Sequence, residues 1–203
     1  MKLLGSDTSP YTRKVRLVLA EKGIPCSYEA APPREPGSPV PQANPLGRVP
    51  TLILDDGTAV YDSPVICEYL DALGDRPVLI PRGDPAARMR VRRWEALADG
   101  IMDSAVVMRV ESLRPAERQD PATLALHDAA VGRAVAHAAR ELGEREWCEG
   151  GAISLADLAL VSALGYLDLR QPGRDWRGLH PGLGAWAARM GARASVRGTL
   201  PPR

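Results

Sequence analysis

The sequence predicts two domains, a small mixed α/β domain followed by an all-α domain. Strand-like and helix-like segments alternate over residues 1–75, which is typical of a sheet with helices on its faces. Strand signals disappear after a stretch rich in Gly and Pro at residues 74–85, and helical periodicity alone follows. We therefore place the first domain at residues 1–75, a linker at 76–84 and the helical domain at 85–203.

The first domain is expected to begin with a short strand and an amphipathic helix. Residues 2–5 are mostly apolar and predict the strand. Over residues 10–22, apolar side chains recur at helical spacing, namely Tyr11, Val15, Val18 and Leu19. Gly23 should end this helix as a left-handed cap. Residues 26–30 predict a second strand, and residues 31–45 are too rich in proline for a regular helix, so they predict a loop with up to one helical turn.

Two more strands and a helix complete this domain. Runs of β-forming residues lie on either side of Asp56 and Gly57, within residues 49–63, and predict a hairpin. A helical stripe follows and ends at Gly74; its apolar members are Ile66, Tyr69, Leu70 and Leu73. The expected order is strand, helix, strand, loop, strand, strand, helix.

The second domain shows only helical patterns. One long stripe consists of Trp94, Leu97, Ala98, Ile101, Ala105 and Met108, and another of Leu124, Val131, Val135, Ala138 and Leu142. Residues 154–169 are apolar almost all round, which indicates a helix buried on most sides. Residues 183–190 and those after them predict one or two short closing helices.

Composition and charge argue against several classes of function. The chain has 26 Lys and Arg against 25 Asp and Glu, so no strong field attracts nucleic acid or an anionic membrane. The basic run at residues 88–95 continues as an amphipathic helix with a solvated face. No stretch approaches the roughly 18–20 apolar residues of a membrane span, and we expect a cytoplasmic protein. The spacing of the cysteines and histidines predicts neither a disulfide framework nor a metal site.

Candidate chemistry begins at the start of the first helix. Ser9 precedes Pro10, and this pair forms a good helix N-cap, so capping alone accounts for Ser9. The functional alternative uses the same geometry, because a helix N-terminus stabilises an anion such as a thiolate. A serine is a poor nucleophile without a base, and no Ser-His-Asp set is visible. Its hydroxyl would instead donate a hydrogen bond to the sulfur of a thiol substrate.

A similar arrangement recurs at the start of the third helical segment. Asp62 and Ser63 precede a proline there. Ser63 is explained as a cap, yet its hydroxyl and the positive helix end also suit a carboxylate. Asp62 would pair with an ammonium group, and an α-amino acid carries both. Upstream, Pro50 opens a strand, either as an ordinary trans edge proline or as a cis proline that leaves the backbone of Val49 facing a ligand.

A capping box at residues 153–160 completes the set of motifs. Ser154 is the expected N-cap, and Asp157 returns a hydrogen bond to its backbone; the role is structural. With these pieces in order, the whole chain resembles the soluble glutathione transferases. The matching stretches are TSPYTRKVRLVLAEKGI (8–24), NPLGRVPTLIL (44–54), DSPVICEYL (62–70), ISLADLAL (153–160) and HPGLGAWAARMGAR (180–193).

The resemblance implies a thioredoxin-like N-terminal domain and assigns roles to its residues. Ser9 matches the activating hydroxyl of the serine-using, bacterial type, with Ser6 and Thr8 as rivals. Val49, before the presumed cis Pro50, matches the residue whose backbone pairs with the cysteinyl part of glutathione. The γ-glutamyl end would be held by Asp62 and Ser63, and the nearest candidates for further polar contacts are Gln42 and Arg48.

The resemblance also implies that the helical domain supplies a pocket for a hydrophobic cosubstrate. Three candidates, Pro10, Tyr11 and Arg13, lie at the mouth of the site, and four lie in the helical domain, Met102, Val106, Arg109 and Tyr166. We expect a homodimer, no permanently bound cofactor, and glutathione as cosubstrate.

The leading hypothesis is conjugation of glutathione to a small hydrophobic electrophile. One alternative is a non-catalytic binding or regulatory protein of the same fold. Another is a glutathione-dependent isomerase, dehalogenase or peroxidase. The sequence does not separate these, because the outcome depends on the second substrate.

Overall fold

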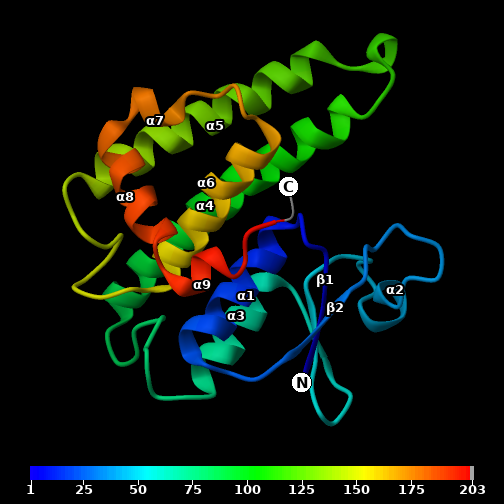
Figure 1. Cartoon of the computed structure of the whole chain (residues 1–203), viewed down its shortest axis with the longest axis vertical. Helices are drawn as coiled ribbons and strands as arrows, with labels where there is room; N and C mark the ends of the chain where they lie inside the picture. The colour runs from blue at the N-terminus through cyan, green and yellow to red at the C-terminus, as the bar shows by residue number, and fades with distance from the viewer. Residues whose placement is uncertain (202–203) are drawn as a thin grey trace. The chain divides into compact units, whose positions relative to one another are not determined.

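The computed structural model describes residues 1–201. The chain divides into two compact units: Met1–Arg82 together with the segment that starts at Arg193, and Gly83–Ala192 (Figure 1). Within the described residues, every strand lies in the first unit, and the second unit is helical. The predicted fold class is confirmed.

The first unit contains a four-stranded sheet with helices on both faces. Its elements are β1 (Lys2–Gly5), α1 (Pro10–Lys22), β2 (Ser27–Ala30), α2 (Val40–Ala43), β3 (Thr51–Ile53), β4 (Ala59–Val60), α3 (Ser63–Ala72) and, near the C-terminus, α9 (Ala194–Arg197). The strand order is β2-β1-β3-β4, with β1 parallel to β2, and with the β1–β3 and β3–β4 pairs antiparallel. Figure 1 shows α1 and α3 on one side of the sheet and α2 on the other.

Alternation along β1 divides the core of this unit between the two faces. Leu3 pairs with Leu52 across β1 and β3, and both are buried. Leu4 points to the opposite face, where it forms a small buried cluster that includes Val40 of α2. Val49 packs against this cluster. The core therefore helps to position Val49 at the entrance to β3.

A buried ion pair joins the C-terminal ends of α1 and α3. Lys22 Nζ lies 3.2 Å from Asp71 Oδ1, and the two side chains are 1% and 5% exposed. Lys22 Nζ also donates to the carbonyl oxygens of Gly74 and Pro77, at 3.1 and 2.9 Å. Asp71 Oδ1 accepts the backbone N–H of Leu79 at 2.8 Å. These bonds compensate for the desolvation of the pair and fix α1 against α3.

The second unit consists of α4 (Pro85–Ser112), α5 (Pro121–Leu142), α6 (Leu155–Arg170), α7 (Trp176–Leu179) and α8 (Pro181–Gly191), with a 3₁₀ turn at Ala116–Arg118. Helix α4 packs against both α5 and α6. Nearly every residue in the first three turns of α6 is buried, as its apolar sequence predicts.

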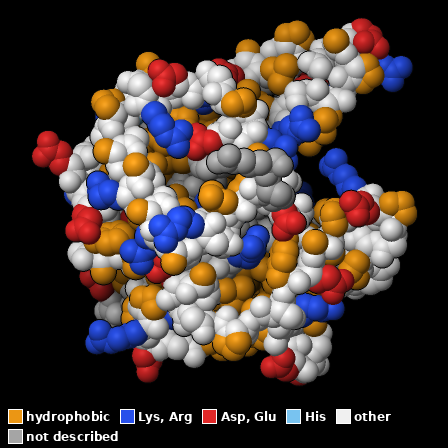
Figure 2. Space-filling view, viewed as in Figure 1, with side chains coloured by type: hydrophobic (Ala, Val, Ile, Leu, Met, Phe, Trp, Pro, Cys, Tyr) orange, Lys and Arg blue, Asp and Glu red, His pale blue; other side chains and the backbone are white. Residues whose placement is uncertain are grey.

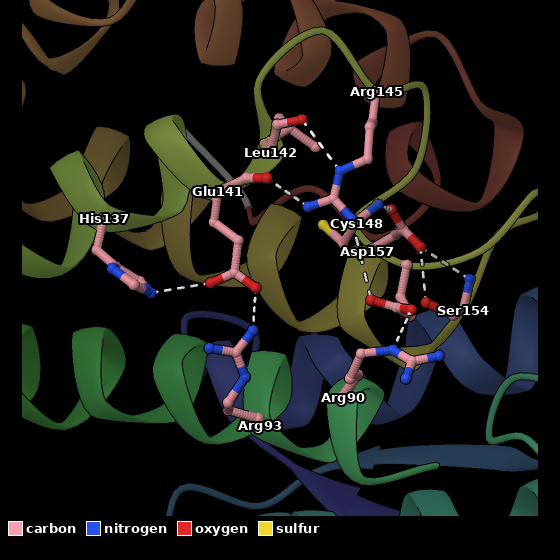
Figure 3. Close-up of polar contacts among 10 residues, drawn as sticks. Arg90, Arg93, His137, Glu141, Leu142, Arg145, Cys148, Ser154 and Asp157 are labelled. Carbon is pink, nitrogen blue, oxygen red and sulfur yellow. Dashed lines mark hydrogen bonds and ion pairs between the residues drawn. The ribbon is translucent and has the colours of Figure 1, made fainter. Parts of the chain in front are cut away.

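The capping box at the start of α6 is buried and fully hydrogen-bonded (Figure 3). Asp157 Oδ2 accepts from the backbone N–H and the hydroxyl of Ser154, at 2.8 and 2.9 Å. Asp157 Oδ1 accepts the backbone N–H of Cys148 at 2.8 Å. Burial raises the pKa of Asp157 despite these bonds, and burial also raises the pKa of the Cys148 thiol. The box anchors the loop before α6 to the helix.

Ion pairs on the surface of the same unit join α4 to α5 and to the loop that follows (Figure 3). Glu141 of α5 pairs with Arg93 of α4, and His137 Nε2 lies 2.9 Å from the other carboxylate oxygen of Glu141. One turn away, Arg90 Nε donates to Glu149 at 2.6 Å. These pairs add a polar rim to the apolar contact between α4 and α5.

The C-terminal segment packs on α1 of the first unit, whereas the sequence analysis assigned residues 85–203 to the helical domain. Arg193 donates two hydrogen bonds, of 2.9 and 2.8 Å, to Glu21 of α1, and the hydroxyl of Ser195 donates to the same carboxylate. Arg13 donates to the carbonyl oxygen of Val196 at 3.4 Å. Burial alone would raise the pKa of Glu21, but these hydrogen bonds from Arg193 and Ser195 outweigh it and lower the pKa.

Among residues 1–201, no helix combines the length and the apolar character that a membrane crossing requires. On the face shown in Figure 2, basic and acidic side chains are interspersed, in agreement with the balanced charge of the sequence.

Candidate active site

Ser9 is the N-cap of α1, and its hydroxyl oxygen accepts the backbone N–H of Thr12 at 3.2 Å. Its carbonyl oxygen accepts the N–H of Arg13 at 3.0 Å, and Pro10 occupies the first helical turn. A hydroxyl that accepts one hydrogen bond still has its own hydrogen to donate. Ser9 is only partly buried. Capping and donation to a ligand are therefore compatible roles for the same side chain.

The turn before Ser9 is tight, which fixes the cap. Ser9 N donates to the carbonyl oxygen of Ser6 at 3.0 Å. A Cβ atom at Gly5 would lie 2.4 Å from Thr12 Cγ2 and 2.8 Å from the ring of Tyr28. Such contacts are too close, so Gly5 allows β1 to approach α1. Ser6 and Thr8, the two rivals of Ser9, lie in this turn and before the first turn of the helix.

At the start of α3, the capping residue differs from the one expected from the sequence. Asp62, rather than Ser63, is the N-cap, because its carboxylate accepts the backbone N–H of Ser63. Ser63 is the first helical residue and is 1% exposed. Its hydroxyl oxygen is buried and has no hydrogen-bond partner among residues 1–201. An unsatisfied buried hydroxyl costs about 1–3 kcal/mol, so this group is poised for a ligand that brings a partner.

The loop before β3 is held by Asn44, a residue that the sequence analysis missed. Asn44 is 1% exposed, and its Nδ2 donates to the carbonyl oxygen of Arg48 at 2.9 Å and to Thr51 Oγ1 at 3.2 Å. Its Oδ1 accepts the N–H of Leu46 at 2.9 Å. The Val49–Pro50 bond inside this loop is cis, as presumed. The Asn-Pro turn signal could have identified Asn44 as the organising residue.

The sheet topology brings Ser9, Val49 and Ser63 to one edge. Ser9 follows the C-terminal end of β1, and Val49 precedes the N-terminal end of the antiparallel β3, where Leu4 pairs with Thr51. Strand β4 runs antiparallel to β3, so Ser63 follows β4 at the same edge. Two helix N-termini with their positive dipole ends are thus located there. This edge is suited to an anionic ligand with hydrogen-bonding groups.

The remaining predicted residues of the first unit differ in how exposed they are. Pro10 is buried and Tyr11 is partly buried at the start of α1, whereas Gln42 and Arg48 are exposed. The Gln42 amide lies against the carbonyl oxygens of Ser38 and Pro39. Among residues 1–201, no side-chain hydrogen bond or ion pair links Gln42 or Arg48 to this edge.

The four predicted cosubstrate residues lie in the second unit. Met102 in α4 is fully buried and Tyr166 in α6 is 7% exposed. Val106 and Arg109 are partly buried on the later turns of α4. Of these, the last two have the exposure that contact with a second substrate requires.

Comparison with known proteins matches both units. Models of the glutathione S-transferase N-terminal and C-terminal domains match residues 8–73 and 121–189. The uncharacterized GST-like protein YibF of Escherichia coli K12 is 36% identical over 207 residues, with 100% of both chains covered. The chain belongs to the glutathione S-transferase family.

Two further relatives extend the comparison of this glutathione S-transferase family member. A crystal structure of a glutathione S-transferase from Methylobacillus flagellatus KT with glutathione bound has a TM-score of 0.96 and 45% identity, with 99% of each chain covered. The maleylacetoacetate isomerase of Pseudomonas aeruginosa is 32% identical over 174 residues, covering 81% of this chain and 80% of that protein.

The N-terminal match includes the whole edge that carries Ser9, Val49 and Ser63. Helix α4 falls between the two matched ranges. The family models therefore cover the candidate glutathione residues but not the α4 residues predicted to contact a second substrate.

Proposed function

We propose that this protein is a glutathione transferase that binds glutathione at the sheet edge and uses Ser9 to stabilise its thiolate. The observation that carries the proposal is the buried hydroxyl of Ser63, which has no hydrogen-bond partner among residues 1–201 and lies at the same edge as Ser9. A glutathione S-transferase that is 45% identical binds glutathione, which supports the choice of ligand.

The γ-glutamyl end of glutathione is assigned to the start of α3. Its carboxylate would accept the free hydrogen of Ser63 Oγ and interact with the positive end of the helix. Its ammonium group would pair with Asp62, which is exposed. The cysteinyl part would pair with the backbone of Val49, whose loop Asn44 holds in place.

The chemistry depends on the ionisation of the bound thiol. A free thiol titrates near pH 8.5, and lowering its pKa by about two units corresponds to roughly 2.7 kcal/mol. The Ser9 hydroxyl hydrogen and the N-terminus of α1 would supply this stabilisation, and the thiol proton leaves to solvent. The thiolate sulfur then forms a bond to the electrophilic carbon. In a substitution the leaving group departs with its electron pair, and in an addition the product carbanion takes a proton.

A second candidate is a glutathione-dependent isomerase, favoured by the similarity to the maleylacetoacetate isomerase of Pseudomonas aeruginosa. The thiolate would add to an activated double bond, allow rotation and then leave, so glutathione is regenerated. Stoichiometry separates the two reactions, because conjugation consumes one glutathione for each product and isomerisation consumes none.

The test is an ultraviolet titration of the thiolate of bound glutathione in the wild type and in Ser9→Ala, with Ser6→Ala and Thr8→Ala as matched controls. We expect Ser9→Ala to keep binding glutathione and to raise the thiol pKa by about two units, and the controls to leave it unchanged. An unchanged titration in Ser9→Ala rejects the role of Ser9, and a shift in a control transfers the role to that residue.

The remaining parts of the proposal concern the partners. Turnover of a panel of small hydrophobic electrophiles tests catalysis, and glutathione binding without any turnover favours a non-catalytic protein. A cytoplasmic homodimer is the arrangement that the family suggests; sedimentation at micromolar concentration tests the dimer.

A further inference from the structure

The first unit contains a hollow on the side of the sheet covered by α1 and next to strand β2. Its volume is about 340 Å³, within the range of small-molecule pockets. Its lining includes Leu3, Arg16, Leu19, Ile24, Cys26 and Tyr28. None of these residues belongs to the edge that carries Ser9, Val49 and Ser63, so the hollow is separate from the candidate glutathione site.

The lining combines apolar walls with a single charged side chain. Leu3 and Leu19 are buried at 1% and 8% exposure, and Ile24 and Pro25 continue the apolar surface after α1. Arg16 is the only ionised group in the lining at neutral pH. A ligand with an apolar body and one negative end would complement this surface.

Arg16 is held in place with much of its donor capacity unused. Its guanidinium lies 4.8 Å from the ring centroid of Tyr28, and the Tyr28 hydroxyl donates to Asp7 at 2.8 Å. Its two polar contacts within residues 1–201 are long, 3.4 Å to the carbonyl oxygen of Gly198 and 3.8 Å to Asp7 Oδ1. A guanidinium has five N–H donors, and a carboxylate accepts two of them in parallel.

We propose that this hollow binds a small amphipathic monocarboxylate, with its carboxylate on Arg16 and its apolar chain against Leu3, Leu19 and Ile24. Asp7 opposes this binding, because its carboxylate would lie near that of the ligand. The positive charge of Arg16 should therefore raise the affinity for the carboxylate, and the negative charge of Asp7 should lower it. The proposal does not depend on glutathione binding.

Cys26 provides a reporter inside the hollow. It is a free, partly buried cysteine, whereas Cys67 and Cys148 are both 0% exposed. The chain has three cysteines in total, so alkylation of the folded protein reports on Cys26. Burial raises the pKa of its thiol, and mildly alkaline buffer is therefore required. A molecule in the hollow should shield Cys26 from the reagent.

The experiment measures the rate of Cys26 alkylation by iodoacetamide with increasing octanoate. Octan-1-ol supplies the apolar body without the charge, and acetate supplies the charge without the body. We expect octanoate to slow alkylation about tenfold at saturation, with or without saturating S-methylglutathione, which has no free thiol to consume the reagent. Acetate should have no effect, and octan-1-ol should require about tenfold higher concentration. Equal protection by octan-1-ol, or none by octanoate, overturns the proposal.

Two variants test the charge with opposite expected signs. Arg16→Gln should weaken octanoate protection about tenfold. Asp7→Asn should strengthen it severalfold, because the opposing charge is removed while the amide oxygen still accepts from Tyr28. If Arg16→Gln fails to fold, Asp7→Asn remains decisive. An unchanged octanoate affinity in Asp7→Asn contradicts the assignment of the carboxylate to Arg16.

Discussion

The N-termini of α1 and α3 share the sequence Ser-Pro but use it differently. At α1 the serine is itself the cap, and its hydroxyl accepts the N–H of Thr12. At α3 the preceding Asp62 is the cap, and the buried Ser63 hydroxyl has no hydrogen-bond partner in the described part of the chain. The same dipeptide therefore predicts a helix start in both places, but the serine hydroxyl serves as the helix cap only at α1.

The largest expected effect is a loss of stability when the ion pair that joins α1 to α3 is broken. Both helices would then be held less firmly. Asp71→Ala leaves Lys22 buried without its counter-charge and should lower the free energy of unfolding by about 3–5 kcal/mol. Urea denaturation measures this free energy of unfolding. Asp75→Ala, at an exposed residue in a loose pair with Arg82, is the control and should change stability by less than about 0.5 kcal/mol. A loss for Asp71→Ala as small as that of the control would mean that apolar packing alone holds α1 against α3.

The next effect concerns Ser63 alone. Ser63→Ala should weaken glutathione binding about 10- to 100-fold, because a hydrogen bond to a carboxylate is lost. It should leave the stability of the empty protein unchanged or slightly higher, since an unsatisfied hydroxyl is removed. Calorimetry with glutathione and urea denaturation measure the two quantities, with the exposed Ser112→Ala as control. Normal affinity in Ser63→Ala would remove the observation on which the proposed function depends.

A smaller effect on stability is expected at Ser9. Unlike the hydroxyl of Ser63, the Ser9 hydroxyl stabilises the empty protein, because it caps α1. Ser9→Ala should lose about 1 kcal/mol because the cap is lost. Ser9→Asp keeps a capping oxygen and should retain that stability, but it has no hydroxyl to donate and should not stabilise the thiolate. Thermal denaturation and turnover with an electrophile measure the two properties. Full turnover by Ser9→Asp would show that capping, not donation, is what the reaction needs.

The smallest effect is a pH dependence of stability at the C-terminal end of α1. The pKa of Glu21 is lowered in the folded protein, so its contribution is present above the ordinary value of 4.5 and is lost as the pH falls below it. Glu21→Gln should therefore be less stable than the wild type at neutral pH, and the gap should narrow on acidification. Urea denaturation at neutral pH and at a pH below 4.5 tests this. The exposed Glu117→Gln serves as the control. A constant gap would exclude ionisation as the cause.

Local patterns in the sequence were sufficient for most of the fold. Gly23 ends α1 in the left-handed region with φ of 63°, the Asp56-Gly57 turn joins β3 to β4, and Ser154 with Asp157 forms the capping box. Each of these depends on residues only a few positions apart. Their physical causes are therefore visible in a short stretch of sequence.

Features that depend on distant contacts were not predictable in the same way. The capping role of Asp62 rather than Ser63 depends on which oxygen reaches a backbone N–H. The burial of the Ser63 hydroxyl depends on the surrounding core. The docking of Arg193 on Glu21 joins residues that no spacing rule connects. The sequence indicated candidate residues for the site, but not the hydrogen-bond partners of each side chain.

The attachment of the C-terminal segment to α1 has a consequence for biosynthesis. Because the segment that starts at Arg193 belongs to the first unit, the helical unit is in effect an insertion. The contacts of this segment with Glu21 and Arg13 of α1 can form only after the helical unit has been synthesised. The helical unit is by then fully synthesised and able to fold as a domain, so the unit that starts first should be completed last.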